Sequence, residues 1–292
     1  MTLAWRVIGD KEASAQEDAA RHVVSYAFAN RTLANGMRWF GIPSFNGDPG
    51  SAAGKALPPM IAALQQDREA LATGPGIVFD LRGNGGGSSD WSYQIAKILW
   101  GEQALSRRPE TRIDVDWRVS AANLKTIDDG YARRGGKDMS AESRRWYEAV
   151  IAGLKGALAR NAALWREGDT SNAETTATAL PTPAVTPLHA PVYFITDASC
   201  GSACLDAVDL WRSMGAIHVG RTTSADTLYM EVRSFKLPSG LSGGGMPMKV
   251  YRGRPRGSNE PVVPVYHFDG DMTDTAGLET WIVGLQKTKA SS

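Results

Sequence analysis

Ser202 has the surroundings of a nucleophile. It lies in a run of small residues, 198–203, that follows the short apolar stretch 192–195. After Ser202 the apolar residues recur at helical spacing, so the sequence predicts a buried strand, a tight turn and a helix. A serine at a helix N-terminus faces unpaired N–H groups and the positive end of the helix dipole, which favour a developing anion. The alternative is an ordinary N-cap, since serine is common there.

A second turn of the same kind lies upstream. The apolar stretch 76–81 runs into 82–87, which reads Arg-Gly-Asn-Gly-Gly-Gly, before a helix-like segment from Ser89 to Trp100. The backbone amides of this turn could face an oxyanion, bind a phosphate or only form a tight turn. The nucleotide interpretations are weak, because neither G-K-[ST] nor G-x-G-x-x-G is present. The G-x-S-x-G elbow is also absent, because Cys200 and Cys204 occupy its glycine positions.

Together the two turns resemble a known family. The stretch DLRGNGGG at 80–87, followed later by an apolar strand and the Gly-Ser-Ala turn at 201–203, resembles the S41 serine peptidases, which include C-terminal processing and tricorn-type proteases. Two further stretches support the resemblance, RWFGIPSF at 38–45 and GAIHVGRT at 215–222. The similarity covers about 37–100 and 189–281.

The resemblance implies an acyl-transfer enzyme that cleaves peptide or protein substrates. Ser202 would attack the carbonyl carbon, and the amides of Ala203 and of Gly86 or Gly87 would hold the oxyanion. No cofactor and no metal are expected. The alternative is a binding module without catalysis, like the retinoid-binding repeats of the eye, which resemble the same fold. The glycine turns favour the enzyme, and the gaps in the catalytic set favour the binding module.

A serine hydroxyl needs a base at neutral pH. In the processing-protease branch the base is a lysine, but that position holds Asp226 here, and the position of the usual glutamine holds Met230. The tricorn-type branch uses a histidine oriented by a glutamate. Glu260 stands at a matching spacing beyond Ser202, and its alternative is a residue in a solvated loop.

The histidine of that branch belongs to an N-terminal helical region that the chain lacks before residue 37. Among the four histidines, His22 is the candidate base, with a packed core residue as its alternative. His189, His218 and His267 do not have the family context. The sequence leaves open whether the base lies outside this chain.

The resemblance implies an α/β core with a mixed sheet of the ClpP/crotonase kind, formed by 37–101 and 189–292. The strands that contain Asp80 and Phe194 are expected to be central neighbours, so that both turns leave the same sheet edge. Residues 229–236 and 247–251 are predicted to be strands of the same mixed sheet. Residues 1–36 would be an N-terminal remnant, the end of a PDZ-like module.

Residues 102–188 are predicted to be a helical insertion that caps the active site, with a Thr/Pro-rich linker at 168–189. It would contain a strand at 112–117 and a helix from Ser140 to about Trp165, with Trp146, Val150 and Leu154 on its buried face. An amphipathic helix is predicted at 57–71 and a closing helix at 275–287. The spacing of Cys200 and Cys204 allows a disulfide, but two free buried thiols are equally compatible with the sequence.

Composition narrows the class of protein. The chain has 292 residues, a formal net charge of +1 and 42% hydrophobic residues. This near balance of charge, without blocks of like charge, argues against nucleic acid or a membrane surface as partner. Neither a membrane span nor a signal peptide is recognisable in the sequence. Because S41 peptidases usually work outside the cytoplasm, the resemblance implies a periplasmic or extracellular location.

Overall fold

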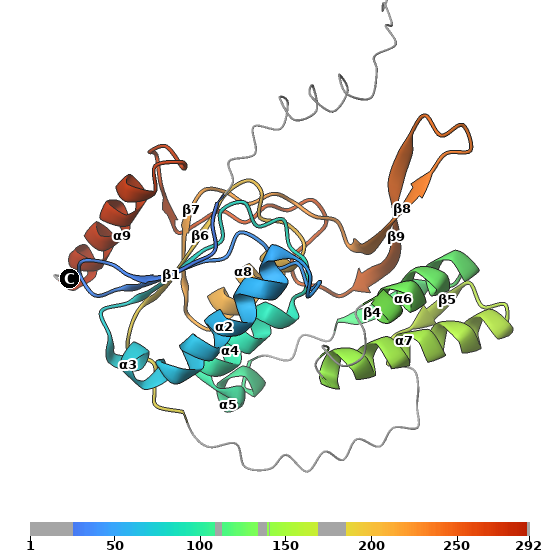
Figure 1. Ribbon diagram of the computed structural model, residues 1–292, viewed down its shortest axis with the longest axis horizontal. Helices are drawn as coiled ribbons and strands as arrows, with labels where there is room; N and C mark the ends of the chain where they lie inside the picture. The colour runs from blue at the N-terminus through green and yellow to red at the C-terminus, as the bar shows by residue number, and fades with distance from the viewer. Residues whose placement is uncertain (1–25, 109–112, 134–138, 140, 169–184, 291–292) are drawn as a thin grey trace, which may run out of the picture.

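The computed structural model of the protein describes residues 26–108, 113–133, 139, 141–168 and 185–290 (Figure 1). The expectations for residues 1–25, which include His22, for Ser140 and for most of the Thr/Pro-rich linker lie outside the described residues. The principal feature is a six-stranded sheet in the order β1-β2-β3-β6-β7-β10. Its strands are β1 Ala29–Thr32, β2 Arg38–Gly41, β3 Ile77–Asp80, β6 Val192–Thr196, β7 Ile217–Gly220 and β10 Tyr266–His267.

The sheet is mixed, as predicted. β1 pairs antiparallel with β2, and the other neighbours are parallel. The central strands β3 and β6 are buried along their whole length, because helices cover both faces of the sheet and only continuous apolar runs can occupy such strands. This explains why their sequences read as unbroken apolar stretches.

Two layers of helices cover the sheet. Phe40, Phe79 and Phe194 point to one face, where they pack in a core with α2 Ala52–Gln66, α3 Arg68–Thr73, α4 Asp90–Trp100 and α8 Ala203–Ser213. The alternate residues Trp39, Val78 and Tyr193 point to the other face and pack with α9 Thr275–Ala290. Figure 1 shows α9 on the opposite side of the sheet from α2, α4 and α8. The short helix α5 Glu102–Ser106 follows α4.

A second unit stands beside this core. Its four-stranded antiparallel sheet has the order β5-β4-β9-β8, with β4 Asp114–Arg118, β5 Leu164–Arg166, β8 Tyr229–Lys236 and β9 Gly243–Arg252. Helices α6 Ala121–Arg133 and α7 Ala141–Ala159 pack on it around a separate hydrophobic core. The prediction that 229–236 and 247–251 belong to the main sheet is therefore wrong. Most residues of β8 are exposed or half-buried, which suits an antiparallel strand with a solvated face.

The predicted helix from Ser140 to Trp165 is also too long. α7 ends at Ala159, and Asn161 adopts a left-handed backbone conformation with φ 54° that turns the chain back. Trp165 belongs instead to β5 and is buried against the helix that it was predicted to extend. A Cβ atom added at Gly153 would lie 2.1 Å from the Trp165 ring.

This contact predicts the effect of a single methyl group. Gly153→Ala should lower the free energy of unfolding by about 1–3 kcal/mol, because the added methyl group displaces a packed indole. Gly156→Ala on the same helix is the control, since its Cβ would meet only the end of Arg160, at 3.3 Å, and should stabilise the protein by up to about 1 kcal/mol. Thermal unfolding measures both. Equal melting temperatures for the two variants would contradict the packing described here.

Candidate functional site

The two turns leave the same edge of the main sheet. β3 and β6 are parallel neighbours, with Asp80 paired to Ile195 at their ends. The expectation that these strands are central neighbours is confirmed. The chain therefore leaves both strands in the same direction, into the glycine turn at 82–87 and into the turn that contains Ser202.

The glycine turn and the serine turn are in van der Waals contact. A Cβ atom at Gly86 would lie 2.8 Å from Ser202 Cβ and 2.9 Å from the Ala203 amide nitrogen. Gly86 also has φ +100°, which side-chain-bearing residues rarely adopt. The Phe45 N–H donates to the Gly86 carbonyl at 3.0 Å and holds the turn against the neighbouring chain. Only glycine can adopt this φ readily and also leave room for the Ser202 turn so close to the Gly86 Cα.

Ser202 is held in an unusual backbone conformation. Its φ of 54° and ψ of −124° lie outside the regions that non-glycine residues favour, immediately before the first residue of α8. Such strain costs about 1–3 kcal/mol and persists only where the surrounding structure imposes it. A strained serine between a strand and a helix is the feature that defines a nucleophile elbow, although the flanking residues here are Cys200 and Cys204.

A disulfide joins the two flanking cysteines. Cys200 and Cys204 are bonded to each other, with Cα atoms 5.3 Å apart, and both are fully buried. The structure thus decides between the two states that the sequence allowed. Ser224 supports the same turn by donating from its hydroxyl to the Cys200 carbonyl at 2.7 Å. The disulfide and this bond together brace the strained backbone at Ser202.

The backbone donors near Ser202 are not equivalent. The Gly86 N–H donates to Asn84 Oδ1 at 2.9 Å, while Asn84 Nδ2 donates to the Ile42 carbonyl. The Gly86 N–H is therefore already occupied, which favours Gly87 of the two glycines expected as oxyanion donors. For the amides of Gly87 and Ala203, no acceptor lies in the part of the chain that the structure describes. These two amides are available to an anion.

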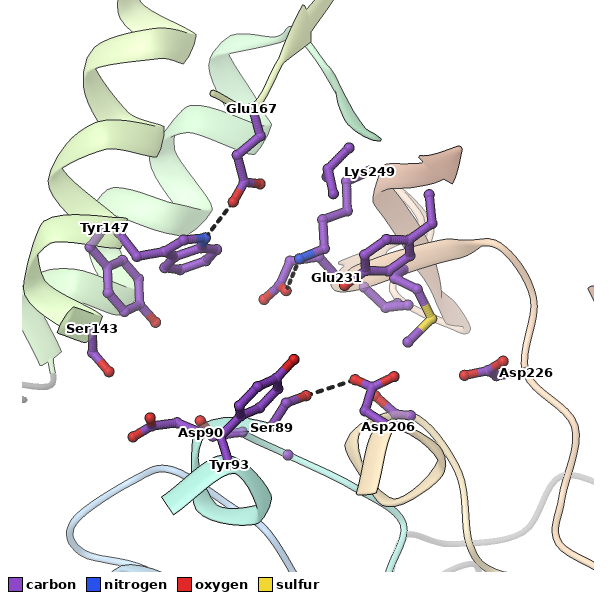
Figure 2. Close-up of a pocket in the computed structure, with 18 of the residues that line it drawn as sticks. Ser89, Asp90, Tyr93, Ser143, Tyr147, Glu167, Asp206, Asp226, Glu231 and Lys249 are labelled. Carbon is purple, nitrogen blue, oxygen red and sulfur yellow. Dashed lines mark hydrogen bonds and ion pairs between the residues drawn. The ribbon is translucent and has the colours of Figure 1, made fainter. Parts of the chain in front are cut away.

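Ser202 opens into a pocket of about 880 Å³ between the core and the second unit. Ser89, Asp90 and Tyr93 lie on the core side, and Tyr147, Glu167, Glu231 and Lys249 lie across from them (Figure 2). The wall of this pocket is thus built by α4 and α8 on one side and by α7, β4, β8, β9 and Glu167, which follows β5, on the other.

A half-buried carboxyl, that of Asp206, lies one helical turn beyond Ser202. Asp206 Oδ2 accepts a hydrogen bond from the Ser89 hydroxyl at 2.7 Å, as Figure 2 shows. Burial raises the pKa of Asp206, although the Ser89 bond and the charge of Arg256 act in the opposite direction. Neither residue was identified from the sequence, yet the spacing of four along a predicted helix places Asp206 on the face of Ser202.

Asp226, which stands at the position of the family lysine, lines the same pocket. It forms ion pairs with two guanidinium groups, with Arg254 at 2.9 Å and with Arg256. Arg256 also pairs with Asp209 at 2.9 Å. This position is therefore an acidic anchor for two arginines. Met230, at the position of the family glutamine, lines the pocket as well.

Glu260 lies close to this region but outside the pocket lining. Its loop runs beside the Asp226 segment, since the Asn259 N–H donates to the Asp226 carbonyl at 2.7 Å. The Glu260 carboxylate, however, is exposed and accepts from the Gly257 N–H at 2.9 Å. The loop that contains Glu260 therefore lies near the site, but the Glu260 carboxylate is bonded to a backbone N–H of the same loop.

No histidine of the described residues lines the pocket. His189 is exposed, and His267 contacts Asp269 and Arg221 at the surface. His218 is fully buried in β7, as a core residue should be, where its ring stacks on Phe194 at 4.8 Å.

Comparisons with known proteins concern the fold. No protein-family model and no curated protein matches the sequence. Mature CPAF in complex with lactacystin matches at a TM-score of 0.48 and 14% identity, over 90% of this chain and 54% of that one. The photosystem II D1 C-terminal processing protease matches at 0.36 and 14%, over 86% and 48%. A protein of Bacteroides fragilis NCTC 9343 assigned to the S41 proteases matches at 0.42 and 12%, over 89% and 57%.

The similarity is to peptidases. Two of these structures are a C-terminal processing protease and a protein assigned to the S41 proteases. The chain spans about half the length of each of the three. At TM-scores below 0.5 the likeness concerns the path of the chain, so the chemistry of the site rests on the residues described above. No helix among the described residues is long and apolar enough to cross a membrane.

The buried histidine predicts how stability depends on pH. Burial, and secondarily the charge of Arg212, lowers the pKa of His218 to about 3 in the folded state, against about 6.5 in an unfolded chain. Between these values the unfolded state binds more protons, so stability rises with pH. As the pH falls from 6.5 toward 3, this group alone should remove about 1.4 kcal/mol per pH unit.

Urea unfolding of wild type and His218→Gln at a series of pH values measures this effect. The variant should show a flatter dependence, and the His218 ring should stay neutral by NMR down to about pH 4. Titration of the ring near pH 6 in the folded protein would contradict its burial.

Proposed function

We propose that this chain is a serine hydrolase of the S41 kind, which cleaves peptide bonds by acyl transfer through Ser202. The observation that carries the proposal is the strained backbone of Ser202 at the start of α8, in contact with Gly86 and open to the pocket. A serine that only capped a helix would have no need for this conformation, and its side chain makes no capping bond to α8.

The two unoccupied amides define the oxyanion site of the proposed mechanism. The Ser202 hydroxyl attacks the substrate carbonyl, and the oxygen that gains charge accepts hydrogen bonds from the N–H groups of Ala203 and Gly87. The dipole of α8 adds to this stabilisation because Ala203 is its first residue. The C–N bond then breaks, the amine leaves with the proton that the base took from Ser202, and water hydrolyses the resulting ester to restore the hydroxyl. Each donor of this kind typically contributes about 3 kcal/mol to transition-state stabilisation.

The base that accepts the Ser202 proton completes the proposal. A lysine dyad of the processing-protease kind is not available, because the position of its lysine holds Asp226, which pairs with Arg254 and Arg256. The candidates for the base are His22, which lies outside the described residues, and a group outside this chain. We assign Glu260 as the carboxylate that orients the base. The support for Glu260 is that its loop lies beside the Asp226 segment. In this assignment the Glu260 carboxylate exchanges its bond with the Gly257 N–H for one with the base.

The finer architecture and the location belong to the same proposal. The parallel strands β2, β3, β6 and β7 support a core of the ClpP/crotonase kind. Residues 102–188 act as a cap in this proposal, because β4, α7 and Glu167 line the side of the pocket opposite α4. The buried disulfide supports a periplasmic or extracellular location, since structural disulfides persist in oxidising compartments.

A peptide-binding module without catalysis is the second candidate. It is favoured by one observation, that the described part of the pocket contains carboxylates and lysines and lacks a histidine. The strained serine argues for the hydrolase, because a binding surface gains nothing from backbone strain at a hydroxyl. Reactivity of Ser202 therefore separates the two candidates.

A fluorophosphonate probe tests the proposal directly. The folded chain should be labelled covalently, because the probe reacts with activated serines, and Ser202→Ala should abolish the labelling. Ser199→Ala is the matched control, since Ser199 is exposed in the same turn and should leave labelling unchanged. Mass spectrometry of the labelled peptide gives the site. A folded wild-type chain that takes up no probe, or label that survives in Ser202→Ala, would reject the hydrolase.

The contact between the turns predicts a second result. Gly86→Ala should slow labelling of Ser202 at least tenfold, because the new methyl group would lie within 3 Å of Ser202 Cβ and the Ala203 nitrogen and would disturb the oxyanion site. Gly85→Ala, where nothing lies within 4 Å, should label at the wild-type rate. The second-order rate constant of labelling measures both variants. Equal rates would show that the glycine turn does not form the site.

A further inference from the structure

The wall of the pocket opposite Ser89 and Tyr93 contains an ion pair. Lys249 of β9 and Glu231 of β8 are 3.3 Å apart, and Figure 2 shows the pair across the pocket from those two residues. Both line the pocket that contains Ser202. They therefore face whatever molecule Ser202 attacks.

The charges of the side chains at this wall do not sum to zero. A second carboxylate, Glu167, accepts hydrogen bonds from the indole N–H groups of Trp117 and Trp146, both at 2.7 Å. Indole donors are neutral, so Glu167 keeps its negative charge. Burial is the largest single influence on the pKa of Lys249 and lowers it. The charges of Glu231 and Glu167 act in the opposite direction, and the net result is a raised pKa. One ammonium group thus faces two carboxylates, and the wall has a net negative charge.

The carboxylate of the pair is also the more accessible partner. The Glu231 side chain is 41% exposed, whereas the Lys249 side chain is 10% exposed. The Lys249 ammonium is enclosed by the rings of Trp117, Trp146 and Tyr251, at 5.1, 5.6 and 5.4 Å from their centroids. A ligand in the pocket would therefore meet the carboxylate first.

Aromatic rings accompany this carboxylate. Tyr229, two residues before Glu231, is 59% exposed, and Tyr93 on the facing helix is 45% exposed. Both line the pocket. Ring faces attract ammonium and guanidinium groups, and the enclosed Lys249 shows that the neighbouring rings already hold a cation. A carboxylate beside exposed rings suits a cationic side chain better than a neutral or acidic one.

The strand that carries Glu231 suits an extended peptide. β8 is the last strand of its sheet among the described residues, so no strand of this part of the chain pairs with its outer edge. Tyr229 to Val232 line the pocket. An extended segment can pair with such an edge through its backbone and place alternate side chains in neighbouring pockets.

We propose that Glu231, with Tyr229 on the same strand and Tyr93 facing it across the pocket, forms a subsite that selects an arginine or lysine side chain of an extended peptide. The inference rests on the proposed function, because it names the substrate class of the Ser202 pocket. Glu231 supplies the charge that binds the cation, and Glu167 offsets the repulsion from Lys249. Asp226 is less suited to this role because it is neutralised by Arg254 and Arg256.

Binding to the Ser202→Ala protein tests the subsite without relying on catalysis. The probes are three blocked hexapeptides of alanine with one central arginine, citrulline or glutamate, since citrulline has nearly the shape of arginine without its charge. Calorimetry should show that the arginine peptide binds at least fivefold more tightly than the citrulline peptide and that the glutamate peptide binds weakest. The preference should decrease at high salt.

Substitutions assign the preference to Glu231. In the Ser202→Ala background, Glu231→Gln should reduce the ratio between arginine and citrulline to below twofold, and Glu231→Asp should keep most of it. Glu148→Gln is the matched control, because Glu148 lies in the same unit, outside the pocket lining, and bonds Tyr131; it should change nothing. Circular dichroism establishes that each variant is folded.

Two results overturn the subsite and leave the proposed function intact. They are equal binding of the arginine and citrulline peptides, or no binding of the arginine peptide, while wild type is still labelled at Ser202. A preference that Glu231→Gln does not reduce overturns the role of Glu231. An arginine preference in a protein that the fluorophosphonate does not label supports the subsite and rejects the hydrolase.

Discussion

The site depends on one close approach, the contact of Gly86 with the turn that contains Ser202. It needs two adjacent parallel strands, because only then do both turns emerge at one edge. It also needs a residue without Cβ, because any side chain at Gly86 would overlap Ser202 and Ala203. The rest of the core holds the two turns in contact. The helices on both faces keep β3 and β6 buried and central, and Phe45 fixes the glycine turn from the other side.

The pocket divides into two electrostatic halves. Near Ser202 the free amides of Gly87 and Ala203 and the start of α8 favour an anion. The opposite wall has two carboxylates and one enclosed ammonium group. A peptide that bound both halves would present a carbonyl oxygen to the first and a cationic side chain to the second.

Much of the core could be predicted from the sequence. The apolar runs at 77–80 and 192–195 identify buried parallel strands, and the glycines and Ser202 mark the turns that follow them. The origin of the second sheet could not be predicted, because β9 pairs with β4 across more than a hundred residues of sequence, and β8 joins the sheet only through β9. The pair between Ser89 and Asp206 also joins residues far apart in the sequence. The pair between Lys249 and Glu231 depends on the register of the β8–β9 hairpin. The end of α7 at Ala159 was missed because Trp165 continues the helical spacing while belonging to the returning strand.

The disulfide explains how the chain maintains a strained serine without the glycines of the usual elbow. In a G-x-S-x-G turn the flanking glycines let the backbone approach closely and turn sharply. Here the same positions are cysteines, whose bond ties the residue before Gly201 to the first turn of α8. Ser224 adds a hydrogen bond to the Cys200 carbonyl. A covalent bond and a hydrogen bond thus oppose relaxation of a conformation that costs about 1–3 kcal/mol. The strain at Ser202 is therefore maintained by the fold around it, as the proposed role of a nucleophile requires.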